Sequence, residues 1–333
     1  MFKKLIVKAA AAQISPVLED KSGTLKKIAN SIIEASKNDA DIIVFAETLV
    51  PNYPYFSFIK PAVSIRKDHT KLYEQAVVVP SEDTEFIGGV AREHKIVVVL
   101  GINERDKGTL YNTQLIFDTT GELVLKRRKI TPTYHERMIW GQGDGSGLKA
   151  VDASIGRIGA LACWEHYNPL ARFALMNDHE EIHCSQFPGS MVGQIFADQM
   201  EVTMRHHALE SGCFVINATA YLHPEQVQAI TTDENMQKVL NKGCFTAIIS
   251  PEGVIISDVL TEGEGIVYAE MDMSLITKRK RMMDSIGHYS RPELLSLLID
   301  KEPKKLMKEK PTVLPKNMND ENNDIRKQSY VTE

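Results

Sequence analysis

The sequence lacks the features that define several classes of protein. Its four cysteines, Cys163, Cys184, Cys213 and Cys244, include no Cys-x-x-Cys pair for a metal or a redox couple, which favours a reducing compartment. No apolar run approaches the ~20 residues of a membrane-spanning helix, and no apolar signal-peptide core follows the basic start of the chain. A net charge of −5 argues against a general nucleic-acid binder. We therefore expect a cytoplasmic protein with no membrane or nucleic-acid partner.

The bulk composition is ordinary, but it changes near the end of the chain. Hydrophobic residues make up 43% and charged residues 25% of the 333 residues, as in soluble globular proteins with a large core. Residues 301–310 are dominated by charge, and residues 311–333 are polar with few large apolar side chains. We expect a single domain over 1–300 and a disordered tail over 301–333; the alternative is that the tail takes part in assembly.

Strand-like and helix-like segments alternate in both halves of the chain. Short apolar runs that end at turn residues predict buried strands, and apolar residues at a spacing of three and four predict helices. Besides a strand at the N-terminus, the predicted strands are 41–46, 96–101, 110–118, 122–128, 156–162, 182–187, 213–218, 243–249 and 254–257, and the predicted helices are 24–37, 81–94, 169–176 and 194–210. Helical connections combined with hairpins indicate an α/β protein with a mixed sheet.

Three residues with reactive side chains each follow a strand-like segment: Glu47, Lys129 and Cys163. A carboxylate at the mouth of an apolar strand loses water, which raises its pKa and makes it a base near neutral pH. On an alternating strand Lys129 shares a face with Arg127, so a basic side chain can point inward, favour a thiolate and stabilise negative charge. Each residue also has an ordinary explanation: an exposed strand-end Glu, a solvated basic edge strand and a buried core thiol.

Taken together, these residues resemble the nitrilase superfamily, and five segments in order resemble its true nitrilase branch. The resemblance extends from about Ala10 to about Leu298 and is closest in character to bacterial and cyanobacterial nitrilases of broad substrate range. Ala46 departs from the Pro that often precedes the family's glutamate. The five segments are Phe45–Pro54, Lys126–Lys129 with Thr131–Arg137, Gly141–Gly145, Cys163–His166 and Gly287–Pro292.

The resemblance implies a catalytic set of Glu47, Lys129, Glu136 and Cys163. In that scheme Glu47 takes the thiol proton and Cys163 attacks a nitrile carbon to give a thioimidate, which water converts through an acyl-enzyme to the carboxylic acid and ammonia. Lys129 and the backbone N–H of Trp164 stabilise the negative charge. No metal or organic cofactor is expected.

Residues that follow the catalytic positions are expected to shape or support the site. Tyr53, Tyr134 and Trp164 are candidates for the substrate pocket, together with loops at 54–68 and 187–193, although Tyr53 is equally well explained as a packing residue. Glu165 and His166 are expected to support the cysteine loop. The pair His206–His207 does not predict a metal site, because adjacent helix residues face different directions.

The resemblance further implies a four-layer αββα sandwich with two mixed sheets, spanning a single carbon-nitrogen hydrolase domain over 1–300. It also implies a homodimer that buries the helices 169–176 and 194–210, and a higher spiral oligomer to which the tail could contribute. The sequence leaves open an amidase or a cyanide-hydrating enzyme of the same superfamily, and a catalytically idle assembly scaffold. It does not identify the nitrile substrate.

Overall fold

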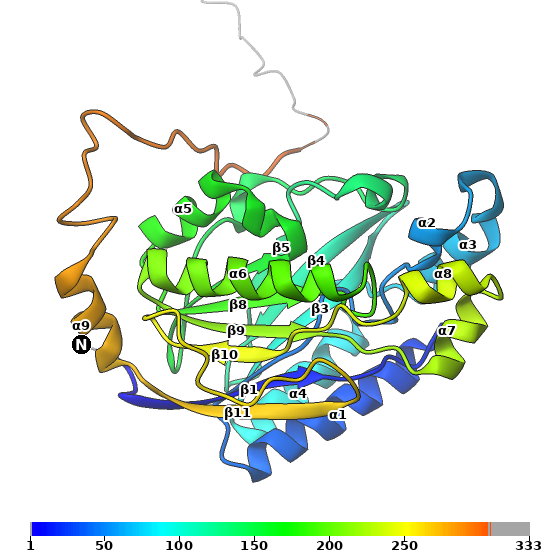
Figure 1. The fold of residues 1–333 in the computed structure, drawn as a ribbon, viewed down its shortest axis with the longest axis horizontal. Coiled ribbons are helices and arrows are strands. Elements are labelled where there is room, and N and C mark those ends of the chain that lie inside the picture. Colours follow the sequence, from blue (N-terminus) through cyan, green and yellow to red (C-terminus); the bar gives the residue numbers. More distant parts are fainter. Residues whose placement is uncertain (1, 306, 308–333) are drawn as a thin grey trace, which may run out of the picture. The chain divides into compact units, whose positions relative to one another are not determined.

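The computed structural model describes residues 2–305 and 307, and those up to Glu302 form one compact unit with two β-sheets (Figure 1). One sheet has six strands in the order β11-β1-β2-β3-β4-β5, and the other has five in the order β10-β9-β8-β7-β6. The strands are β1 (Ile6–Gln13), β2 (Ile42–Val44), β3 (Val97–Asp106), β4 (Thr109–Phe117), β5 (Leu123–Arg128), β6 (Val151–Ala153), β7 (Gly156–Ala162), β8 (Ile182–Phe187), β9 (Phe214–Thr219), β10 (Ala247–Ile249) and β11 (Gly265–Asp272).

Both sheets are mixed, as predicted. In the first sheet β1, β2 and β3 are parallel, while β11, β4 and β5 pair antiparallel with their neighbours. In the second sheet β7, β8 and β9 are parallel, and β6 and β10 are the antiparallel edges. Parallel neighbours require crossover connections, which the helices supply.

Helices cover the outer face of each sheet. Figure 1 shows α1 and α4 on the outer side of the first sheet and α5 and α6 on the outer side of the second, with the sheets between them. The helices are α1 (Lys21–Lys37), α2 (Phe56–Ile59), α3 (Arg66–Glu74), α4 (Glu82–His94), α5 (Pro169–Asn177), α6 (Gln194–Ser211), α7 (Pro224–Ile230), α8 (Glu234–Val239) and α9 (Ser274–Met282). The expected four-layer αββα sandwich is confirmed.

Alternation along the strands produces separate hydrophobic layers. On β1, Val7, Ala9 and Ala11 pack in the core that also contains Ile158 of β7 and Ile216 of β9, so these side chains lie between the sheets. The intervening Ala10 and Ala12 pack instead with Ile28 and Ile32 of α1. Successive side chains of a strand point to opposite faces, so a small-residue strand such as β1 can be buried on both sides.

The structure corrects two expectations. Residues 254–257 do not form a regular strand: Ile255 makes an isolated bridge to Ile249, and the Ser257 hydroxyl accepts the Ile248 N–H that a ladder would otherwise use. The segment 54–68, expected as a loop, contains α2 and the start of α3.

The predicted tail lies almost entirely outside the described residues. Within 2–305, no helix combines the length and apolar character needed to cross a bilayer.

Candidate active site

The three strand-end residues converge from both sheets. Glu47 comes shortly after β2, Lys129 directly follows β5, and Cys163 directly follows β7. The Glu47 N–H donates to the carbonyl of Phe187 at 3.3 Å, which joins the end of β2 to the end of β8 across the two sheets. The site therefore exists only where the ends of the two sheets meet.

The close approach of β3 to the Glu47 loop depends on Gly101. A Cβ at Gly101 would lie 2.4 Å from the Ala46 carbonyl oxygen and 2.9 Å from the Glu47 Cα, closer than packed atoms can be. On the neighbouring strand β4, Asn112 Nδ2 donates to Glu47 Oε1 at 2.6 Å. Glu47 Oε2 has no hydrogen-bond partner among the described residues, so one carboxylate oxygen is fixed and the other is free to accept a proton.

Lys129 joins two glutamates in the buried interior. Its Nζ donates to Glu47 Oε1 at 2.8 Å and to Glu136 Oε2 at 2.7 Å, and all three side chains are almost completely buried. Burial alone would lower the pKa of Lys129, but the negative charges of Glu136 and Glu47 raise it well above its usual value. Burial raises the pKa of Glu47 to about 7 despite the opposing effect of Lys129, which suits a base near neutral pH.

Glu136 is held on all sides by donors. It lies in a short 3-10 turn, Tyr134–Met138, where Oε2 also accepts the Thr133 N–H at 2.7 Å and so caps the turn. The hydroxyl of Tyr53 donates to Glu136 Oε1 at 2.8 Å. Tyr53 is thus more than a packing residue, because it fixes the carboxylate that binds Lys129.

Cys163 lies in an unusual backbone conformation. Its φ is 53°, in the left-handed region that a non-glycine residue rarely adopts, which turns the chain sharply out of β7. Burial raises the pKa of the Cys163 thiol well above its usual value, and Glu47 adds to this effect; Lys129 and the Trp164 N–H, which donates to the sulfur, lower it. The resting sulfur is therefore protonated, and a base would have to remove its proton to form a thiolate.

Cys163 opens onto an apolar cavity of about 150 Å³. All three candidate pocket residues line it, Tyr53 in the interior and Tyr134 and Trp164 at more exposed positions. The remaining lining residues are Phe58, Thr133, His135, Glu136, Pro188, Met191, Val192 and Phe196. A cavity with mostly apolar walls, lined by the thiol of Cys163 and by the Glu136 carboxylate that binds Lys129, suits a small, uncharged organic substrate.

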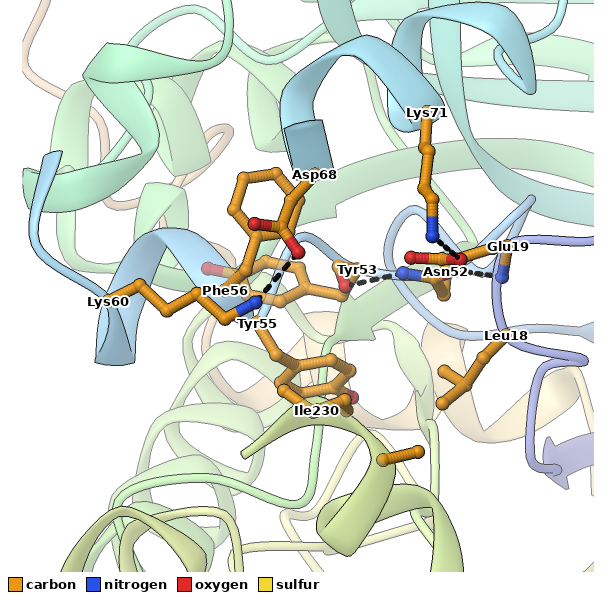
Figure 2. A pocket seen from close by; sticks show the side chains of 11 residues that line it. Leu18, Glu19, Asn52, Tyr53, Tyr55, Phe56, Lys60, Asp68, Lys71 and Ile230 are labelled. Atoms are coloured by element: carbon orange, nitrogen blue, oxygen red, sulfur yellow. Dashed lines mark hydrogen bonds and ion pairs between the residues drawn. The ribbon is translucent and has the colours of Figure 1, made fainter. Parts of the chain in front are cut away.

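Tyr53 also borders a second cavity, of about 430 Å³, which Figure 2 shows. The ion pairs Lys60–Asp68 at 2.7 Å and Lys71–Glu19 at 2.6 Å lie in its wall. None of the four candidate catalytic residues lines this cavity, so it lies apart from the proposed chemistry.

The two residues expected to support the cysteine loop, Glu165 and His166, are buried within the short 3-10 turn Cys163–Tyr167. Glu165 pairs with Arg127 through two hydrogen bonds of 2.8 Å and accepts the N–H groups of Ile130 and Ala162 at the same distance. His166 Nδ1 lies 2.6 Å from the carbonyl oxygen of Cys163. Glu165 therefore connects the segment that carries Lys129 to the segment that carries the cysteine.

Two features of the site were not predicted from the sequence. Asn112 was not singled out, although the polar run Asn112–Gln114 inside an otherwise apolar strand was a signal that could have found it. His207 was set aside together with His206, but it lies buried beside Glu180 and His183, and these three residues form a cluster whose ligand atoms are within 4.8 Å of one another. The sequence separation of these residues hid the cluster.

Comparisons with known proteins identify the family of this chain. The sequence profile of the family described as Carbon-nitrogen hydrolase matches residues 8–281. A protein of Paraburkholderia phymatum named nitrilase is 62% identical over 303 residues, which cover 91% of this chain and 89% of that protein. An aliphatic nitrilase of Rhodococcus rhodochrous is 37% identical over 298 residues, or 87% of this chain and 81% of that protein.

Solved structures support the same fold. The crystal structure of a carbon-nitrogen hydrolase from Helicobacter pylori G27 aligns with a TM-score of 0.71 at 20% sequence identity, covering 87% of this chain and 97% of that chain. The resemblance to true nitrilases seen in the sequence is confirmed by the identities to named nitrilases. This chain belongs to the carbon-nitrogen hydrolase family.

Proposed function

We propose that this protein is a nitrilase that hydrolyses an organic nitrile to the carboxylic acid and ammonia. One observation carries the proposal: Lys129 binds both Glu47 and Glu136 beside an apolar cavity that ends at the thiol of Cys163. The 62% identity to a protein named nitrilase supports nitriles as the substrate class. The exposed surroundings of Tyr134 and Trp164 suggest that these two residues contact the substrate as it enters.

The first half of the reaction forms a covalent intermediate. Glu47 Oε2, which has no other partner among the described residues, takes the thiol proton while the sulfur of Cys163 attacks the nitrile carbon. The electron pair of one C–N π bond moves to nitrogen, which takes up the proton held by Glu47 and gives a thioimidate, and Glu47 becomes a carboxylate again. Lys129 and the Trp164 N–H stabilise the charge that develops on nitrogen.

The second half consumes two water molecules. The first water gives its proton to Glu47 and adds to the thioimidate carbon; the tetrahedral species expels ammonia and leaves a thioester. The second water attacks the thioester, releases the acid and returns the proton to sulfur. Glu136 orients Lys129 and the incoming water. The scheme needs no metal or cofactor, and full activity after dialysis against EDTA is expected.

Product analysis with a panel of nitriles and their amides tests the proposal. We expect wild-type protein to release ammonia from nitriles faster than from the matching amides, and Cys163→Ala to release none above background. Faster turnover of amides would instead identify an amidase, and formamide or formate from cyanide would identify a cyanide-hydrating enzyme. If the protein shows neither turnover nor nitrile-protected labelling of Cys163 by a thiol probe, the scaffold alternative is correct.

We also propose that the protein assembles as a homodimer through the outer faces of α5 and α6. Apolar side chains on these helices are exposed in the single chain, among them Leu170 at 60%, Ile195 at 56% and Val202 at 70%. Light scattering of Val202→Glu is expected to show a smaller particle than wild type. Light scattering of a variant truncated after residue 300 tests whether the tail contributes to a higher spiral oligomer.

A cytoplasmic location is a further part of the proposal. All four cysteines are free and buried, as is usual for a protein from a reducing compartment. Fractionation of cells that express the protein, with compartment markers, tests this location.

A further inference from the structure

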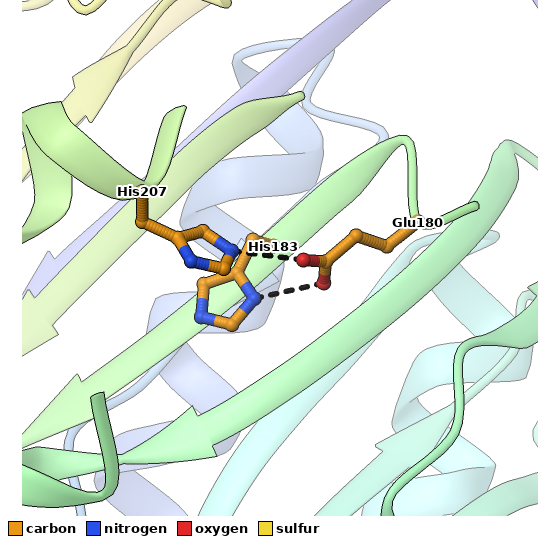
Figure 3. Close-up of side chains that lie close together, drawn as sticks. All are labelled: Glu180, His183 and His207. Atoms are coloured by element: carbon orange, nitrogen blue, oxygen red, sulfur yellow. Dashed lines mark hydrogen bonds and ion pairs between the residues drawn. The ribbon is translucent and has the colours of Figure 1, made fainter. Parts of the chain in front are cut away.

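A chain of buried hydrogen bonds runs away from the back of the nucleophile. His166 Nδ1 lies 2.6 Å from the Cys163 carbonyl oxygen, and His166 Nε2 lies 2.8 Å from Nε2 of His183. His183 Nδ1 lies 2.8 Å from Glu180 Oε2, and the other oxygen of Glu180 lies 2.8 Å from Nε2 of His207 on α6. Figure 3 shows both histidines directed at the two oxygens of this carboxylate.

The position of Glu180 is built into the fold. A Cβ at Gly159, on the strand that leads to Cys163, would lie 2.0 Å from Glu180 Oε2 and 3.1 Å from its carboxyl carbon. Only glycine at this position leaves room for the carboxylate. Glu180, His183 and His207 are all fully buried, so the two carboxylate oxygens and the nitrogens that face them depend on one another, while His207 Nδ1 has no hydrogen-bond partner among the described residues.

The groups at the two ends of this series of hydrogen bonds, the Cys163 carbonyl and the Glu180 carboxylate, determine where its protons lie. A carbonyl oxygen and a carboxylate are both acceptors, so each of the three contacts between Cys163 and Glu180 needs a proton on an imidazole nitrogen. Two neutral imidazoles carry two protons, one fewer than the three contacts require. The hydrogen-bond geometry therefore calls for a third proton shared by His166 and His183, whose charge the Glu180 carboxylate neutralises. Burial opposes that charge, because it lowers the pKa of His166 well below its usual value and the pKa of His183 to about 4. The charges and hydrogen bonds of His183 and His207 overcome the effect of burial and lower the pKa of Glu180 to about 2, consistent with an ionised carboxylate.

Donation from His166 to the Cys163 carbonyl matters because that carbonyl belongs to the Cys163–Trp164 peptide group. The Cys163 carbonyl and the Trp164 N–H belong to the same trans peptide and point in opposite directions. A donor on the carbonyl therefore fixes the orientation of the N–H, which donates to the Cys163 sulfur. Hydrogen bonds in series polarise one another, so a donor on the carbonyl also strengthens that N–H as a donor.

We propose that Glu180 and His183, acting through His166, orient and polarise the Cys163–Trp164 peptide, which makes them positioning residues for the thiolate and for the charge that develops during attack. This inference rests on the proposed function only for its turnover readout. The chain also opposes the strain of the left-handed Cys163 backbone, because it fixes the carbonyl on one side of that residue.

A metal ion is the alternative occupant of the Glu180, His183 and His207 cluster. Each oxygen of Glu180 already faces a different histidine at 2.8 Å, the length of a charge-assisted hydrogen bond. His183 also uses its other nitrogen toward His166, so hydrogen bonds account for the arrangement without an ion.

The experiment compares His183→Leu, which has no donor, with His183→Gln, which retains one. His69→Leu on α3 is the matched control for the same substitution outside the chain of hydrogen bonds. Turnover of a nitrile gives kcat and KM. The rate of Cys163 alkylation by iodoacetamide across pH, with Cys163→Ala as the baseline, measures how readily the thiol ionises in the absence of substrate. Urea unfolding shows whether each variant is folded.

We expect folded His183→Leu to lose about 10²-fold in kcat, the size of effect seen when an oxyanion donor is lost, with KM nearly unchanged. Its alkylation should require higher pH, because the thiolate loses the support of an oriented N–H. His183→Gln should recover much of both, and His69→Leu should match wild type. A kcat for His183→Leu within twofold of wild type, or a change confined to KM, would overturn the proposal.

Two further variants keep the inference testable. If His183→Leu does not fold, Gly159→Ala should displace Glu180 and raise the pH needed for alkylation, and an unshifted profile would refute the inference. In Glu180→Gln the amide can donate to His183 and accept from His207, but the negative charge is lost, so the thiol profile should shift to higher pH by less than in His183→Leu. If wild-type protein contains stoichiometric zinc and Glu180→Gln does not, the cluster is a metal site and the proposed series of hydrogen bonds is wrong. Failure of nitrile turnover with an intact alkylation pattern would count against the proposed function alone.

Discussion

Replacing Glu165 by alanine should remove a large part of the protein's stability. Both partners of the Arg127–Glu165 pair are buried, with side-chain exposures of 1% and 2%. Removing one partner of a buried pair costs about 3–5 kcal/mol, because the other charge stays buried without compensation. Glu165→Ala also leaves the N–H groups of Ile130 and Ala162 without their acceptor, at about 1–3 kcal/mol each where water does not replace it.

Where water does not replace the lost acceptor, the low ends of these ranges give a loss of about 5 kcal/mol, a large part of the ~5–15 kcal/mol that stabilises a typical domain. Urea unfolding at fixed protein concentration, followed by far-UV circular dichroism, measures it. The double variant Arg127→Met/Glu165→Leu should be more stable than Glu165→Ala, because no charge remains buried. A loss below about 1 kcal/mol in the single variant would refute this account of the pair.

The same pair sets a pH dependence of stability. Burial alone would raise the pKa of Glu165, but Arg127 and the two backbone donors lower it below its usual value. A carboxyl whose folded-state pKa is depressed stabilises the protein fully above the unfolded pKa, and the contribution is lost as the pH falls through the folded pKa. Glu165→Gln should therefore show a weaker loss of stability than wild type on acidification below the usual pKa of a Glu side chain.

Three further predictions concern the site itself. Because the pKa of Glu47 is raised to about 7, kcat/KM should fall as the pH drops through that value, and a profile flat down to pH ~5 would exclude Glu47 as the base. Tyr53→Phe should lower the free energy of unfolding by about 1–3 kcal/mol, since it removes the hydroxyl that binds Glu136; an unchanged urea midpoint would contradict this. Gly101→Ala should lower kcat about 10²-fold, because its Cβ would displace the Glu47 loop from its position against Ala46, and wild-type activity in this variant would disprove the tight approach.

The sequence predicted the parts of the site that depend on local pattern. Glu47, Lys129 and Cys163 each follow a strand-like segment, and the ends of strands are where functional side chains of an α/β protein come together. The alternation that assigned Arg127 and Lys129 to one face of β5 is observed, since both are buried while Lys126 and Arg128 bind Glu104 at 2.8 and 2.7 Å nearer the surface.

Contacts between distant segments could not be predicted in the same way. Tyr53 and Glu136 are 83 residues apart, and Glu180 and His207 are 27 apart on different elements. Each pairing depends on how distant segments pack against one another, and the periodicity of a local sequence pattern carries no information about that packing. The short elements α2 and α8 escaped detection because four to six residues carry too little periodic signal.

The pairing of β1 with β11 has a consequence for synthesis of the chain. All eight residues of β1, from Ile6 to Gln13, find partners in β11, from Asp272 to Gly265. During translation from the N-terminus, the strands carrying Glu47, Lys129 and Cys163 are all made before β11 exists. Until then one side of β1 is an open, apolar edge that can pair with another nascent chain. A chain interrupted before residue 265 would thus contain Glu47, Lys129 and Cys163 but would lack the strand that covers β1. We expect such a chain to depend on chaperones rather than to act as a smaller enzyme.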